Sequence, residues 1–144
     1  MRITTRGRYA LRASLALARM ESEHGGPVSV SRLAVAEDIS PVFLEQIFFK
    51  LRKAGIVSSS RGPGGGFSFS KSLDKLTVME ILDSSGEEID LTFCDKHEAN
   101  CERLGDCMSH YVIAEAQDLL KKYFSDITIA SILEKFAGVK PVAI

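Results

Sequence analysis

A change of hydrophobic period near Gly55 limits the folds open to this chain of 144 residues more than any other feature. Before it, apolar residues recur at helical spacing up to Ala54. After it come IVSSS, the turn RGPGGG, and FSFS, in which Phe67 and Phe69 alternate with serines. Alternation beside a glycine-rich turn predicts a β-hairpin. Helices that lead directly into such a hairpin predict a winged helix-turn-helix.

Two helices are predicted at the start of the chain. An amphipathic helix with a basic end runs from Thr4 to about Met20, and Gly25-Gly26-Pro27 breaks it. A short second helix covers residues 30–38, with Ser29 as its N-cap.

A third helix begins after a tight turn. Ser40 is its predicted cap, Pro41 suits its first turn, and it ends near Ala54. Its buried stripe is Leu44, Ile47, Phe48 and Leu51. The second and third helices form a helix-turn-helix, in which the third can enter the DNA major groove.

Charge divides the chain in two. Residues 1–71 hold eleven Lys and Arg against five Asp and Glu, whereas residues 72–144 hold seven against fourteen. Only the front half is therefore expected to meet a polyanion. We expect double-stranded DNA as the partner of residues 1–76.

Candidate DNA contacts come from the first helix, the third helix and the wing. Gln46 can pair with adenine and Glu45 can accept from a cytosine amino group, although either can instead be a solvated surface residue. The basic side chains, Arg12 among them, are expected to contact the phosphate backbone. The full candidate set is Arg2, Arg6, Arg8, Ser40, Val42, Glu45, Gln46, Lys50, Arg52, Lys53, Arg61, Gly62 and Gly64.

The acidic half, residues 77–144, is expected to form one integrated unit. Thr77 and Glu80 make a capping box before a helix over residues 78–85, which should pack the wing onto the rest of the acidic half. A long amphipathic helix over 107–125 is interpreted as a dimerisation helix, and the alternative is that it completes a monomer core. Thr128 caps a last helix, residues 129–136. The predicted fold class is therefore mainly α with a small β-hairpin wing.

Soft ligands gather between residues 92 and 110. All three cysteines, Cys94, Cys101 and Cys107, lie there together with His110. Cys107 and His110 are three residues apart, so they should face the same side of the first turn of the long helix. An odd cysteine count cannot close entirely into disulfides, so metal binding or redox chemistry is favoured. From spacing alone, an iron–sulfur cluster and a Cys3His zinc site are equally supported. The alternatives are an unliganded thiol switch and a His110 that merely caps the helix or packs.

From Met1 to about Phe136 the chain resembles the winged-helix iron–sulfur regulators typified by IscR and NsrR. The resemblance rests on RGRYALRA at 6–13, FLEQIFFKLRKAGIVSSSRGPGGG at 43–66, the three cysteines and TIASILEK. It implies a homodimer with one cluster per subunit, whose state sets DNA affinity and sequence preference. It also implies that the three cysteines ligate the cluster.

Two branches of this family differ in their cluster. The IscR-like branch adds a histidine that matches His110 and holds [2Fe-2S]. The nitric-oxide-sensing branch holds [4Fe-4S], in some members with an aspartate where this chain has Arg8. The resemblance therefore favours [2Fe-2S]. It also implies that Glu45 obstructs one class of DNA site unless the cluster is bound.

The chain departs from the IscR-like pattern at two places. The first cysteine gap has six residues where five are usual, which makes His97 an alternative ligand. Phe49 is apolar at an outward position of the third helix.

Other functions find no support in the sequence. Neither G-x-x-x-x-G-K-[ST] nor G-x-G-x-x-G before a helix occurs, and no nucleophile is placed with a base, so we expect no enzyme and no small-molecule substrate. No run of 18 apolar residues occurs and the N-terminus lacks a small-residue cleavage site, so we expect no membrane partner and a cytoplasmic location.

Overall fold

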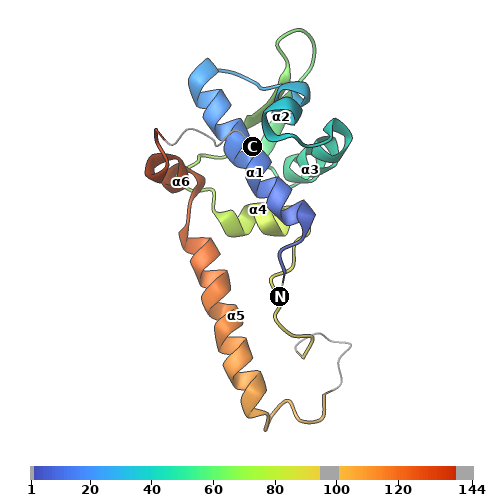
Figure 1. The fold of residues 1–144 in the computed structure, drawn as a ribbon, viewed down its shortest axis with the longest axis vertical. Helices are drawn as coiled ribbons and strands as arrows, with labels where there is room; N and C mark the ends of the chain where they lie inside the picture. The colour runs from blue at the N-terminus through green and yellow to red at the C-terminus, as the bar shows by residue number, and fades with distance from the viewer. Residues whose placement is uncertain (1, 95–100, 139–144) are drawn as a thin grey trace.

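The computed structural model describes residues 2–94 and 101–138 and is mainly helical, with one two-stranded antiparallel sheet (Figure 1). This architecture confirms the predicted fold class. The elements in chain order are α1 (Thr5–His24), α2 (Val30–Glu37), α3 (Pro41–Lys53), β1 (Val57–Ser60), β2 (Gly66–Phe69), α4 (Val78–Ser85), α5 (Met108–Asp126) and α6 (Ile129–Lys135).

The first two helices end at residues with positive φ. α1 continues to His24, four residues beyond the predicted end, because no residue interrupts it before Gly25, whose φ is 64°. α2 ends one residue early, since Asp38 takes the left-handed conformation with φ 51° and donates its amide to the carbonyl of Ala34.

α3 buries the predicted stripe: Leu44, Ile47, Phe48 and Leu51 are all buried. The predicted capping by the Ser40 side chain is wrong. Ser40 holds the N-cap position and its carbonyl accepts from the amide of Leu44 at 3.0 Å, but its hydroxyl makes no cap hydrogen bond. Pro41 at the first position lacks an N–H, so one fewer amide needs a cap.

The wing pairs β1 with β2 in a register that sets Val57 opposite Phe69 and Ser60 opposite Gly66. Gly66 must be a glycine, because a Cβ there would lie 2.2 Å from the carbonyl oxygen of Val28. That close approach lets Val28 and Phe67 exchange two backbone hydrogen bonds of 2.9 Å, which attach β2 to the start of the helix-turn-helix.

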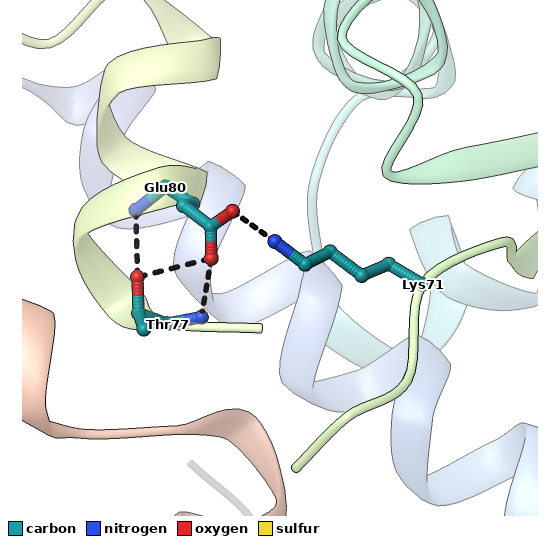
Figure 2. Close-up of polar contacts among 3 residues, drawn as sticks. All are labelled: Lys71, Thr77 and Glu80. Carbon is teal, nitrogen blue, oxygen red and sulfur yellow. Dashed lines mark hydrogen bonds and ion pairs between the residues drawn. The ribbon is translucent and has the colours of Figure 1, made fainter. Parts of the chain in front are cut away.

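α4 begins with the predicted capping box. The Thr77 hydroxyl accepts from the amide of Glu80, and the Glu80 carboxylate accepts from the amide of Thr77 at 3.0 Å (Figure 2). The Lys71 ammonium, from the segment after β2, also binds this carboxylate. This ion pair therefore links the end of the wing to the start of the acidic half, as predicted. The body of α4 packs on α1, α3 and α5.

One core joins α1, α2, α3 and β1 with Leu76, Ile81 of α4 and Ile129 of α6. A second, smaller cluster of Val78, Leu82 and Ile89 receives Leu120 and Phe124 from the end of α5. The rest of α5 extends away from the other helices, and none of its residues is buried (Figure 1). Among the described helices, none is both long and apolar enough to cross a membrane.

Candidate functional site

The predicted DNA-contact residues lie on the surface of the helix-turn-helix and wing, and all are exposed except Lys50, which is half-buried. Ser40, Val42 and Gln46 share one shallow groove with Thr5 and Tyr9. The first turn of α1 therefore lies beside the first turns of α3, so side chains from both helices can reach the same partner.

Among the basic side chains expected to contact DNA, three make contacts within the chain, and Lys50 and Arg12 are the first two. The Lys50 ammonium donates to the carbonyl of Ser85 at the end of α4 (3.2 Å). Arg12 pairs with Glu37 (3.2 Å) and so joins α1 to α2. The first contact links α3 to α4, and the second links α1 to α2.

Arg52, the third of these side chains, lies between α3 and the wing. It donates to the Ser59 hydroxyl of β1 (3.1 Å), and its guanidinium carbon is 5.7 Å from the centre of the Phe49 ring. Phe49, which the sequence left without a role, therefore supports an exposed guanidinium. The pair fixes the position of a positive charge at the junction of α3 and β1.

The wing tip is exposed and is anchored at its base. Arg61, Gly62 and Gly64 are all exposed. The Glu21 carboxylate accepts from the amide of Phe69 (3.1 Å), so the end of α1 holds β2. The wing is thus oriented by the same helix that carries the N-terminal arginines.

Cys107 occupies the N-cap position of α5 with extended backbone, and His110 is the third residue of that helix. This differs from the expectation that Cys107 begins the first turn, because the helix starts one residue later. Cys94 and Cys107 are half-buried and Cys101 is exposed, and none of the three is in a disulfide. His97, the alternative ligand, lies outside the described residues.

The surroundings of Cys107 favour its thiolate. A hydrogen bond from the Ser109 hydroxyl, 3.1 Å from the sulfur, is the main cause that lowers the pKa of Cys107, and the nearby amide of His110 adds to it. The amide of His110 is near the sulfur, but the Cys107 side chain does not make an N-cap hydrogen bond to α5. A thiolate at a helix N-terminus is the form that binds metals.

The donor set fits a soft metal or an iron–sulfur cluster, because it consists of three thiols and an imidazole within one segment. In the part of the chain that the structure describes, no three His, Cys, Asp or Glu side chains lie close enough together to hold a metal ion. Cys94, Cys101 and Cys107 are therefore near one another in sequence, but in this structure they are not arranged to bind one metal ion together.

Sequence reasoning missed Glu87. Its carboxylate accepts from the amide of Thr4 at 3.1 and 3.2 Å and from the Thr4 hydroxyl, across 83 residues of sequence. The one sequence signal for such an approach is Gly7, a glycine inside a helix, where a Cβ would lie 2.4 Å from the Glu87 carboxylate.

Comparison with known proteins gives consistent results along nearly the whole chain. The pattern of the Rrf2 family, described as an iron-dependent transcriptional regulator, matches residues 3–135. The HTH-type transcriptional regulator IscR of Escherichia coli O1:K1 is 36% identical over 133 residues, which cover 92% of this chain and 80% of that protein.

Solved structures share the fold. IscR of T. potens superposes with a TM-score of 0.76 at 25% identity, covering 100% of this chain and 94% of that one. CymR, the global cysteine regulator of B. subtilis, superposes with a TM-score of 0.74 at 28% identity, covering 94% and 98%. One of these neighbours is named as a cysteine regulator, so the shared fold does not identify the signal to which a regulator responds. An inference about the signal must therefore rest on the candidate ligand residues.

Proposed function

Because this chain belongs to the Rrf2 family and is therefore a DNA-binding transcriptional regulator, we propose that it senses iron–sulfur or redox status as a homodimer. Its cofactor in this proposal is a [2Fe-2S] cluster held by Cys94, Cys101, Cys107 and His110. The observation that carries the proposal is the position of Cys107 at the N-cap of α5, since the same helix supplies the apolar surface for a second subunit.

The dimer surface is a stripe along α5. Met108, Val112, Leu119 and Tyr123 are large, exposed apolar residues at spacings of four, seven and four, so they lie on one face of the helix. Tyr111, Ala114 and Leu119 also line a shallow groove on this helix. A globular domain rarely leaves such a continuous stripe uncovered, and a second copy related by twofold symmetry would cover both stripes at once.

The ligand residues would act through the start of α5. Cys107 offers a sulfur whose thiolate form is favoured by Ser109, and His110 offers a neutral imidazole on the same turn. An iron–sulfur cluster supplies a centre whose charge and integrity change with iron supply and oxidation. Engagement of Cys94 and Cys101 together with Cys107 would tie the segment before α5 to that helix, and the thiols without metal would release it.

The DNA side would use α3 and the wing. Gln46 is exposed in the groove between α1 and α3, where it can read a base edge, while Arg61 and the arginines of α1 bind phosphates. Glu45 is exposed on the same helix, and its carboxylate would repel DNA unless a base amino group faces it. Two recognition helices in a dimer would meet two half-sites.

Anaerobic purification tests the cofactor directly. We expect a coloured protein with about two iron and two sulfide per chain. Alanine at any of the three cysteines should abolish the cluster, whereas His110→Cys should retain it with a changed absorption spectrum and potential. His24→Ala is the matched control, because His24 is an exposed histidine at the far end of α1.

The alternatives give distinct results in the same experiment. A colourless protein with stoichiometric zinc and no iron would falsify the cluster and leave a zinc-stabilised DNA-binding protein. About four iron per chain would identify the [4Fe-4S] type of the nitric-oxide-sensing branch. An unchanged spectrum in His110→Cys would remove His110 from the ligand set.

A further inference from the structure

Glu87 is a buried carboxylate with a specific partner at the start of α1. Only 6% of the residue is exposed, and both of its carboxylate oxygens accept from the amide of Thr4. The Thr4 hydroxyl donates to the same carboxylate and accepts from the amide of Gly7 at 3.2 Å. A negative charge at this end of α1 also complements the helix dipole. The first turn of the helix that carries Arg6 and Arg8 is therefore held by a residue that lies just after α4.

The fit around this carboxylate leaves no spare room. A Cβ at position 7 would lie 2.4 Å from a carboxylate oxygen of Glu87, so the helix accepts the carboxylate only because residue 7 is glycine. The contact is thus a close approach of the α1 backbone and the Glu87 side chain.

The residues on each side of Glu87 contact the other functional elements. The carbonyl of Ser85 accepts from Lys50 of α3 at 3.2 Å. Asp90 pairs with Lys121 of α5 at 3.5 Å, and the amide of Leu91 donates to the Gln117 side chain of α5 at 2.8 Å. We call residues 85–91 the connecting segment. It contacts α1, α3 and α5, and it ends three residues before Cys94.

We propose that Glu87 is a positioning residue that couples the ligand segment to the DNA-contacting face, by holding the start of α1 to the connecting segment. This rests on the proposed function, since the signal it transmits is engagement of Cys94. When Cys94 is held, the connecting segment keeps one arrangement against α5, and Glu87 fixes the arginines of α1 beside α3. When Cys94 is released, the connecting segment can leave that arrangement. The hydrogen bonds of Glu87 to Thr4 then no longer hold the start of α1 in one position.

The test compares Glu87→Gln with Glu134→Gln, an exposed glutamate of α6 that undergoes the same change of charge. Each protein is prepared with its cluster and in metal-free form. Binding is measured by fluorescence anisotropy to one duplex selected from a random library by the loaded wild type. The ratio of loaded to metal-free affinity should fall roughly fivefold or more in Glu87→Gln, because it loses a charge-assisted pair of hydrogen bonds. The same ratio should stay unchanged in Glu134→Gln. Iron content should equal the wild type in both.

A second measurement needs no cluster and no DNA. Amide hydrogen exchange in metal-free protein should accelerate at residues 4–8 in Glu87→Gln, whereas Glu134→Gln should match the wild type. Thr4→Val removes the hydroxyl that donates to Glu87 and accepts from Gly7, and it keeps the amide of residue 4 that also donates to Glu87. If the two side chains act through their contact, the double variant Thr4→Val with Glu87→Gln should show less than the sum of the two single effects. This holds both for the exchange rate at residues 4–8 and for the ratio of loaded to metal-free DNA affinity.

The outcomes separate this proposal from the one it rests on. A wild type whose DNA affinity ignores its metal content contradicts the proposed function, and this coupling with it. A wild type that responds, together with a Glu87→Gln variant that weakens both forms equally, overturns the coupling alone and leaves Glu87 as a helix cap.

Discussion

The helix-turn-helix half and α5 differ in how they use apolar residues. In α3 the stripe Leu44, Ile47, Phe48 and Leu51 is wholly inside the core. In α5 no residue is buried, and its exposed face carries Leu119 at 64% and Tyr111 at 72% exposure. Both helices are amphipathic, yet within its own chain α5 packs only its C-terminal part, through Leu120 and Phe124, on a small cluster. The difference is that the apolar stripe of α3 is covered within the chain, whereas the exposed stripe of α5 is left for the dimer surface proposed above.

The largest effect is expected from Phe48→Ala. Phe48 is fully buried and its ring stacks on Phe67 at 4.8 Å, so truncation should lower the free energy of unfolding by about 3–5 kcal/mol. Phe49→Ala is the matched control one residue along, because Phe49 is 56% exposed and should cost less than about 1 kcal/mol. Urea denaturation at fixed protein concentration measures both. Equal losses would mean that α3 does not separate a buried face from an exposed one.

A second effect is expected in assembly rather than in folding of the helix-turn-helix half. Leu119→Ala should weaken dimerisation by about 2 kcal/mol for each subunit, or roughly a thousandfold in Kd for the symmetric pair. Sedimentation over a concentration series measures the constant. Ser125→Ala is the control, since it is exposed on α5 outside the stripe. If Leu119→Ala dimerised with the Kd of the wild type, the exposed stripe of α5 would not be the dimer surface.

The smallest effect is expected at the joint between wing and α4. Burial raises the pKa of Glu80, but Lys71 and Thr77 outweigh it and hold the pKa below its ordinary value of 4.5. A lowered folded-state pKa stabilises the fold above pH 4.5, and that contribution is lost as the pH falls through the folded-state pKa. Lys71→Met should therefore cost about 0.5 kcal/mol at pH 7, because the pair is partly exposed. The cost should shrink below pH 4.5 in thermal unfolding series. A penalty that is the same at pH 7 and pH 3 would show that packing, not charge, supplies it.

Local patterns predicted most of the helix-turn-helix half. The buried stripe of α3 and the Thr77–Glu80 capping box depend on spacings within one or two helical turns, and both are confirmed. Capping by Ser40 was wrong because residue type indicates a cap position but cannot orient the hydroxyl. For the candidate site, the sequence supplied the ligand types and the exposed DNA-facing residues, while the roles of these residues stay predictions.

The sequence by itself determined which segments become helix or strand, where soft ligands occur and which half carries positive charge. Periodicity, turn residues and composition are local quantities, so they can be read along the chain. Only the tertiary structure decided that Glu87 meets Thr4, that Lys50 reaches the end of α4, and that Leu91 joins α5. Such contacts depend on how the helices pack against one another once they have formed. The Glu87–Thr4 hydrogen bond spans 83 residues of sequence, and no periodic pattern extends that far.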